Sequence, residues 1–152
     1  RDEVREVDED ADVEVHVAVV LDRTFEGEAL ARRRAAADAA FAAFPNLEAI
    51  YCTVRATESA ERQTLAGASF VRGGEHVSRT HRLDGIVDRV GSGDAFAAGV
   101  LHGRLAGLGA QETLELAVAA AALKHSIPGD FNLATLADVE RLAAADRRDI
   151  ER

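Results

Sequence analysis

Two spacings of hydrophobic and polar positions divide the chain into segments. Alternating positions or short apolar runs predict strands, and apolar residues that recur at helical spacing predict helices. The predicted strands are 13–21, 48–54, 64–72 and 75–82, with a short strand or approach segment at 84–88, and the predicted helices are 27–44, 93–105, 111–125 and 135–145. Residues 58–63 are polar and predict a loop. Helices that repeatedly follow strands predict a layered α/β fold.

Local signals support several of these boundaries. Gly73 and Gly74 lie between two predicted strands and predict the turn of a hairpin. The apolar run at 48–54 predicts a buried strand of the parallel type. Thr135 is followed three residues later by Asp138, which predicts an N-cap at the start of the last helix.

Composition narrows the class of protein. The chain has 152 residues, enough for one domain with a single core. Its 27 acidic and 18 basic residues give a formal net charge of −9, which disfavours a general nucleic-acid binder or a protein of anionic membranes. No apolar stretch is long enough to span a membrane and no signal peptide is visible, so we expect a cytoplasmic protein. The single cysteine, Cys52, cannot form an internal disulfide and fits a buried thiol in a reducing compartment.

The start of the chain carries charge rather than core residues. Residues 1–12 are rich in Asp and Glu and predict a solvated entry segment. The chain contains no Met and begins at Arg1. We therefore expect either that residues were removed or that this is part of a longer polypeptide.

A glycine-rich turn directly before a predicted helix is the strongest chemical signal. Gly91, Ser92 and Gly93 let backbone N–H groups approach an anion, because glycine has no Cβ and tolerates positive φ. The helix N-terminus adds free N–H donors and the positive end of a dipole, which suits phosphate. Asp94 is then a candidate base for a hydroxyl that attacks a phosphoryl group. A capped helix start with a carboxylate near the dipole explains the same residues without function.

The remaining candidate groups show no catalytic spacing. Neither Ser92 nor Cys52 is accompanied by a His–Asp arrangement, and no pair of acidic residues identifies a metal site. The five histidines are scattered without the spacing of metal ligands, which favours structural or surface roles for His16, His76, His81, His102 and His125.

The stretch around the turn resembles the C-terminal signature of the ribokinase-like (PfkB) carbohydrate kinases. That signature is approximately D-T-x-G-A-G-D-x-F-x-x-G, and residues 88–99 of this chain are D-R-V-G-S-G-D-A-F-A-A-G. Residues 116–133 and 44–55 are similar to the 2-keto-3-deoxygluconate kinase-like branch. The similarity covers roughly residues 44–140 and corresponds to the C-terminal half of the family. It implies a ribokinase-like three-layer sheet with flanking helices. The N-terminal half, which carries most of the sugar pocket and the lid, would lie outside this sequence.

The resemblance also implies a reaction and its residues. The family transfers the γ-phosphoryl group of ATP, used with Mg²⁺, to a sugar hydroxyl, so Asp94 would be the base and Gly91, Ser92 and Gly93 the anion hole. Thr53 and Arg55 would lie beside the nucleotide phosphates, although an exposed arginine at a strand end is an equal interpretation. The metal ion would arrive with the nucleotide.

Three functions stay open at this stage. The first is phosphorylation of 2-keto-3-deoxygluconate, by this chain or by a protein of which it is the C-terminal part. The second is the same reaction on another sugar, such as ribose, fructose or fructose phosphate. The third is a non-catalytic remnant that binds nucleotide. Family members often form homo-oligomers through the lid that this sequence lacks.

Overall fold

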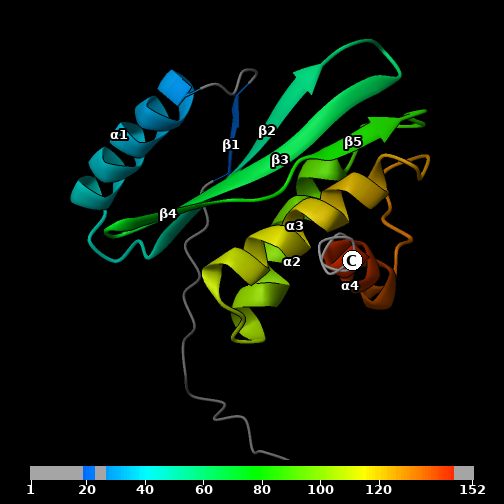
Figure 1. Ribbon diagram of the computed structural model, residues 1–152. Helices are drawn as coiled ribbons and strands as arrows, with labels where there is room; N and C mark the ends of the chain where they lie inside the picture. The colour runs from blue at the N-terminus through cyan, green and yellow to red at the C-terminus, as the bar shows by residue number, and fades with distance from the viewer. Residues whose placement is uncertain (1–18, 23–26, 146–152) are drawn as a thin grey trace, which may run out of the picture.

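The computed structural model describes residues 19–22 and 27–145 of the chain. Four helices and five strands make up this part (Figure 1). In chain order they are β1 (Val19–Asp22), α1 (Gly27–Ala43), β2 (Ala49–Thr57), β3 (Arg62–Val71), β4 (Gly74–Val77), β5 (His81–Asp84), α2 (Ser92–Leu105), α3 (Ala110–Lys124) and α4 (Leu136–Ala144). The predicted segments 1–12 and 13–18 lie outside the described residues.

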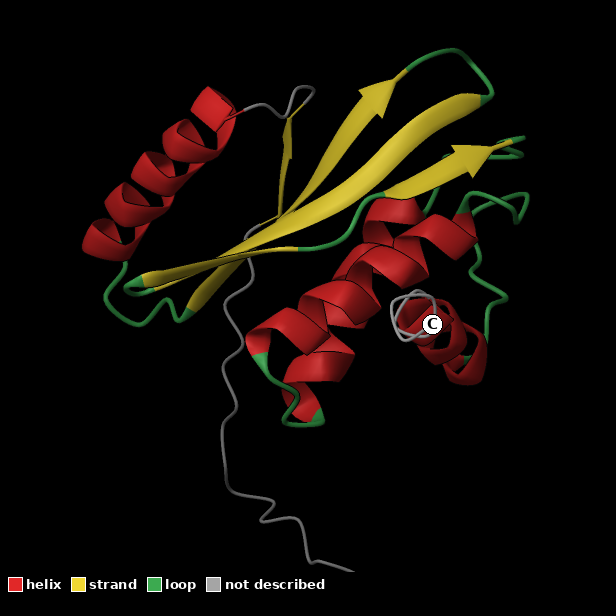
Figure 2. Cartoon of the chain, in the orientation of Figure 1, coloured by secondary structure: helices red, strands yellow, loops and turns green. Residues whose placement is uncertain are grey.

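The strands form one mixed sheet (Figure 2). β1 pairs in parallel with β2, and α1 makes the crossover between them. β2 pairs antiparallel with β3 over its whole length, and β3 pairs with both β4 and β5. The parallel character predicted for 48–54 is therefore right for one neighbour of β2 and wrong for the other.

Helices cover both faces of the sheet, so the fold has three layers (Figure 1). Successive residues of a strand point to opposite faces. Ile50 belongs to the cluster of buried residues that includes Phe41 of α1, whereas Tyr51 belongs to the cluster with Phe96 and Leu114 of α2 and α3. The layered α/β fold predicted from the sequence is confirmed.

The helices α2 and α3 pack tightly against each other and against the sheet. A Cβ at Gly99 would lie 2.6 Å from the Cα of Ala117, and a Cβ at Gly67 of β3 would lie 2.7 Å from a methyl group of Val118. Small residues at these two positions allow α3 to lie close to both neighbours.

The last helix begins as the sequence predicts. The N–H of Asp138 donates to the Thr135 hydroxyl over 3.3 Å, and the N–H of Thr135 donates to the Asp138 carboxylate over 3.1 Å. This reciprocal capping box starts α4, which packs on α3 through Val139.

Three predicted boundaries are wrong. The loop at 58–63 is shorter, because β2 continues to Thr57 and β3 begins at Arg62. The strand at 75–82 is two strands, since Ser78 interrupts it by exchanging hydrogen bonds with the backbone of Gly67. Residues 85–88 do not belong to a strand.

Candidate functional site

The glycine turn has the backbone conformation that the sequence predicts for it. Gly91 has φ 74°, in the left-handed region that favours glycine, and α2 begins at the next residue. A Cβ at Gly91 would lie 2.5 Å from the carbonyl oxygen of Asp130, so the neighbouring loop leaves no room for a side chain. The carbonyl of Gly91 accepts the N–H of Ala95 over 2.9 Å and so starts the helical ladder.

The start of α2 presents unused hydrogen-bond donors. Within the described part of the chain, the N–H groups of Gly93 and Asp94 have no acceptor. A Cβ at Gly93 would meet no atom within 4 Å, so the space beside this residue is open. Free N–H groups at a helix N-terminus and an open approach make this turn suitable for an anion.

Asp94 lies in the first turn of α2 and its side chain is exposed. No hydrogen bond or ion pair holds its carboxylate among the residues that the structure describes. The Asp94 carboxylate is therefore accessible at the start of α2. The N–H of Asp94 adds a donor that the sequence analysis did not include in the anion hole.

Ser92 and Arg55 join the turn to the sheet. The Arg55 guanidinium donates to the Ser92 hydroxyl over 2.9 Å, and that hydroxyl donates to the Arg89 carbonyl, also over 2.9 Å. Ser92 is buried, and its own N–H makes a long bond of 3.4 Å to Arg89. The Ser92 hydroxyl therefore holds the turn in place. Any contact of Ser92 with an anion would have to come from its backbone and not from this hydroxyl.

Positive charge gathers beside the same turn. Burial lowers the pKa of the Arg55 guanidinium, and the charge of nearby Arg89 lowers that pKa further. The Arg89 side chain is exposed and donates to the carbonyl of Ala60 over 2.9 Å. Two guanidinium groups near free N–H donors favour a ligand with negative charge.

Thr53 is placed differently from Arg55. It lies two residues earlier on β2 and is only 1% exposed. Both residues lie within the strand, which ends at Thr57. The structure therefore brings Arg55 to the turn together with Gly91, Ser92, Gly93 and Asp94, and it leaves the Thr53 side chain in the core.

Asp88 organises the turn and was given no role from the sequence. One carboxylate oxygen accepts the N–H groups of Arg89 and Val90 over 2.6 and 3.0 Å, and the other accepts the N–H of Gly129 over 2.8 Å. These bonds, those from Val90 and Gly129 most of all, hold the pKa of Asp88 below its usual value. An aspartate just before a glycine turn is a local signal for such a carboxylate-capped turn.

His125 supports the turn from the core. Its Nδ1 lies 2.7 Å from the carbonyl of Ala121 and its Nε2 lies 2.8 Å from the amide nitrogen of Gln63. These partners fit a neutral ring with the proton on Nδ1, and burial is the main cause that lowers the pKa of His125. The backbone carbonyl of His125 accepts the N–H of Val87 over 2.9 Å, so this residue has the structural role that the sequence favours.

No group of three or more His, Cys, Asp or Glu side chains within the described residues could hold a metal ion. No helix among them is long and apolar enough to cross a membrane.

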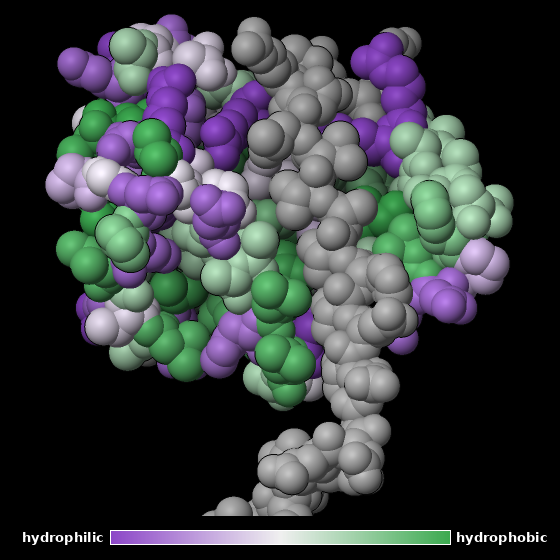
Figure 3. Space-filling model, turned by 180° about the vertical axis from the view of Figure 1, so that it is seen from behind, coloured by the Kyte–Doolittle hydropathy of each residue, from purple (hydrophilic) through white to green (hydrophobic). Residues whose placement is uncertain are grey.

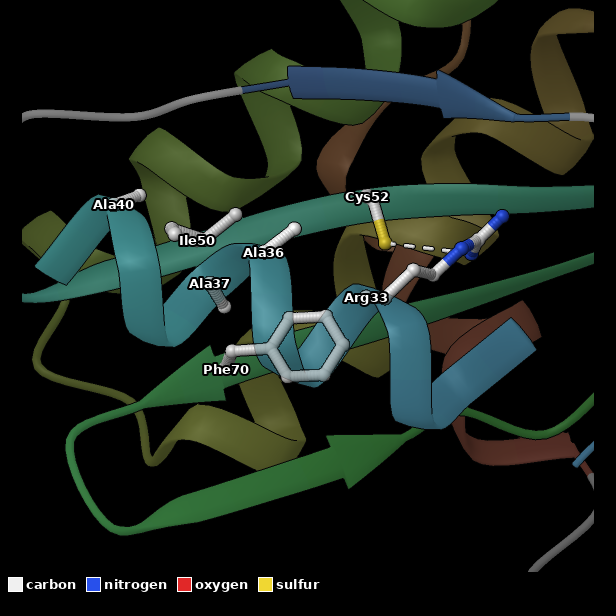
Figure 4. A pocket seen from close by; sticks show the side chains of 7 residues that line it. All are labelled: Arg33, Ala36, Ala37, Ala40, Ile50, Cys52 and Phe70. Atoms are coloured by element: carbon white, nitrogen blue, oxygen red, sulfur yellow. Dashed lines mark hydrogen bonds between the residues drawn. The ribbon is translucent and has the colours of Figure 1, made fainter. Parts of the chain in front are cut away.

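A pocket lies on the other face of the sheet. An apolar pocket of about 130 Å³ opens beneath α1, and the Arg33 guanidinium points to the Cys52 sulfur at 3.6 Å (Figure 4). Figure 3 shows the molecule from behind, with α1 at the right and hydrophobic surface (green) next to it. Cys52 is buried at 3%, as the sequence predicts, and the pocket is separated from the glycine turn by the sheet. The residues that line this pocket are Arg33, Ala36, Ala37, Ala40, Ile50, Cys52 and Phe70.

Comparisons with known proteins agree on one family. Residues 13–133 match the family model described as pfkB family carbohydrate kinase. Among curated proteins, the 2-dehydro-3-deoxygluconokinase of Bacillus subtilis (strain 168) is 43% identical over 51 residues, which are 34% of this chain and 16% of that protein.

Solved structures give a longer match. A PfkB family carbohydrate kinase from Listeria grayi DSM 20601 is 35% identical with a TM-score of 0.70, and the match covers 82% of this chain and 41% of that one. The 2-dehydro-3-deoxygluconokinase of Thermotoga maritima is 31% identical with a TM-score of 0.72, and the match covers 83% of this chain and 41% of that one. The chain thus spans 41% of the length of these two structures.

Proposed function

Because this chain belongs to the pfkB family of carbohydrate kinases, we propose that it takes part in transfer of the ATP γ-phosphoryl group to a hydroxyl of a sugar or sugar acid. The observation that carries this proposal is that the free Asp94 carboxylate and the unused N–H groups occur together at the start of α2. Phosphoryl transfer needs a positioned hydroxyl and stabilised charge more than covalent chemistry by the protein. This turn offers a group for each task.

Asp94 is the proposed base. Its carboxylate takes the proton of the acceptor hydroxyl while the hydroxyl oxygen forms a bond to the γ-phosphorus of ATP. The bond between that phosphorus and the bridging oxygen to the β-phosphate breaks, and ADP leaves with the electron pair. Exposure of the Asp94 side chain supports this role, because an acceptor can reach it.

The turn from Gly91 to Gly93 is the proposed anion hole. Fixed N–H groups that point at developing negative charge stabilise the phosphoryl group during its transfer, and they do not have to move to do so. The open space beside Gly93 leaves room for that group. Arg55 and Arg89 add positive charge for the nucleotide phosphates. Of the two nucleotide-binding residues expected from the sequence, we retain Arg55. For Thr53 only a backbone or indirect role fits its burial.

Mg²⁺ would enter with the nucleotide. Within the described residues no group of three or more His, Cys, Asp or Glu side chains could hold a metal ion by itself. A magnesium ion bound to a triphosphate keeps most of its ligands as water and phosphate oxygen, and it neutralises phosphate charge.

The proposed acceptor is 2-keto-3-deoxygluconate, which is the same compound as 2-dehydro-3-deoxygluconate. Two of the similar proteins carry that substrate in their names. We further propose that the reaction takes place in the cytoplasm, where ATP is available and the Cys52 thiol would stay reduced.

Sugar-dependent release of ADP tests the proposal. The polypeptide that contains this chain in its source is incubated with Mg·ATP and, separately, 2-keto-3-deoxygluconate, ribose, fructose and fructose phosphate, and ADP is followed by a coupled assay. We expect release with 2-keto-3-deoxygluconate to exceed release with each other sugar at least tenfold. Preference for another sugar would overturn the acceptor but keep the reaction class. ATP binding without release on any sugar would overturn the kinase proposal for this chain.

A further inference from the structure

The ammonium group of Lys124 is buried without a carboxylate partner. Lys124 is the chain's only lysine, ends α3 and has an exposed fraction of 0%. Its Nζ donates to the carbonyls of Ile127 and Gly129 over 2.9 and 2.6 Å, and no acidic side chain of the described residues lies within ion-pair distance. Burying a charge is costly unless other groups compensate it, so this position needs a reason.

The buried charge lies directly behind the glycine turn. The Cε of Lys124 is 3.2 Å from the point where a Cβ of Gly91 would be. Gly129, whose carbonyl accepts from Lys124, also donates its N–H to Asp88 over 2.8 Å. Lys124 and Asp88 therefore hold the segment 127–129 from two sides, and they fix it beneath the turn.

Charged groups of both signs surround this segment. Asp88 is one of the negative groups, and hydrogen bonds from Val90 and Gly129 lower its pKa most, with a further lowering by Lys124. The charges of Arg55, Arg89 and Lys124 all lower the pKa of His125, and burial is the larger cause of that lowering. A second carboxylate, that of Asp130, also lies at the turn, because its Oδ1 is 3.1 Å from the point where a Cβ of Gly91 would be. The cations of Lys124, Arg55 and Arg89 thus lie near the carboxylates of Asp88 and Asp130, and of the three cations Lys124 is the one that is fully buried.

We propose that Lys124 is a positioning residue for phosphate binding: its ammonium fixes the segment 127–129 behind the glycine turn and adds positive charge there. The benefit to ATP rests on the proposed function, whereas the fixing of the turn does not. Charge in a poorly solvated interior acts more strongly on a nearby anion than charge in water. Lys124 itself is covered by the turn and does not touch the ligand.

The first test needs no nucleotide. The pKa of Asp88 is measured by carbon NMR, and hydrogen exchange of the Gly129 and Val90 amides is measured in the same samples. In Lys124→Met, which is unbranched, uncharged and one atom shorter than lysine, we expect a higher pKa for Asp88 and at least tenfold faster exchange of both amides. A folded variant with the wild-type pKa and wild-type exchange would overturn the proposal.

The second test separates charge from packing. In Lys124→Ala, n-propylammonium replaces the atoms removed, and n-propanol is a neutral control of the same length. We expect both variants to bind ATP at least tenfold more weakly than the wild type, and n-propylammonium alone to restore binding in Lys124→Ala. Equal effects of the two additives, or ATP binding within twofold of the wild type, would overturn the role of the charge.

Two further outcomes remain decisive. If either variant fails to fold, recovery of the folded state of Lys124→Ala by n-propylammonium but not by n-propanol supports the proposal, and equal recovery contradicts it. If the wild-type chain does not bind ATP, the proposed function fails, and the nucleotide-free test still decides whether Lys124 holds the turn.

Discussion

Arg55 and Ser92, 37 residues apart, are joined by a hydrogen bond of 2.9 Å from guanidinium to hydroxyl. The Ser92 hydroxyl in turn donates to the carbonyl of Arg89, so a continuous chain of hydrogen bonds runs from β2 into the glycine turn. The sheet therefore fixes the position of the turn and, with it, the position of the free N–H groups at the start of α2.

Replacing Arg55 should weaken nucleotide binding more than it weakens the fold. In Arg55→Gln the bond to Ser92 and one positive charge are lost, so we expect ATP to bind about tenfold more weakly. The free energy of unfolding should fall by about 1 kcal/mol, a typical value for one hydrogen bond. Calorimetric titration with ATP and denaturation by urea measure the two effects.

Arg104 provides the matched control. It pairs with Glu48 at the opposite end of α2, about 20 Å away for a helix of this length. Arg104→Gln removes the same charge and should leave ATP binding within twofold of the wild type. Equal losses of ATP binding in the two variants would mean that net charge, rather than the position of Arg55, determines affinity.

The two glycines of the turn should respond differently to alanine. Gly91→Ala forces a side chain into a left-handed conformation and against the carbonyl of Asp130, so we expect a loss of at least 1–2 kcal/mol of stability, on the order of the cost of that conformation alone. Gly93→Ala meets open space and should keep the wild-type stability. Thermal unfolding of the two variants measures this difference.

For ATP binding, Gly93→Ala is the more informative of the two variants. If the space beside Gly93 is where a phosphate enters, its methyl group should weaken ATP binding in Gly93→Ala although the fold is intact. A stable Gly93→Ala with unchanged affinity for ATP would place the phosphate elsewhere.

Stability should depend on pH through His125. Because burial lowers the pKa of His125 below the ordinary value for histidine, about 6.5, the folded state resists protonation. As the pH falls below that value, the unfolded chain takes up a proton that the folded chain does not, so the free energy of unfolding falls until the folded pKa is reached. Urea denaturation at pH 7.5 and 5.5 should show a larger decrease for the wild type than for His125→Gln. The same decrease in both proteins would show that His125 is not the group responsible.

Local signals in the sequence were enough for much of this structure. The start of α2 and the capping box of Thr135 and Asp138 depend on neighbouring residues, and both are where the sequence predicts them. The three-layer arrangement follows from helices between strands, together with the family resemblance. The candidate site, with Gly91, Ser92, Gly93 and Asp94 beside Arg55, was also predictable, because one motif carries four of these residues.

The remaining features depend on partners that are distant in the chain. The interruption at Ser78 arises from its bonds to Gly67 across the sheet, and alternation along one strand does not contain that information. Lys124 is one basic residue at the end of a helix until the fold covers it with the glycine turn and the segment 127–129. The burial of Thr53 likewise depends on how the completed sheet is covered, and the sequence of its own strand does not contain that information.

The most direct test of the account compares wild type and Asp94→Asn for both ATP binding and transfer of radiolabelled γ-phosphate to 2-keto-3-deoxygluconate. The substitution keeps the size of the side chain and removes its basicity, and loss of a positioned base typically costs about 10²–10⁴-fold in rate. We predict transfer reduced by that amount or more, with the Kd for ATP within threefold of the wild type. Undiminished transfer by Asp94→Asn would contradict Asp94 as the base and, with it, the central claim.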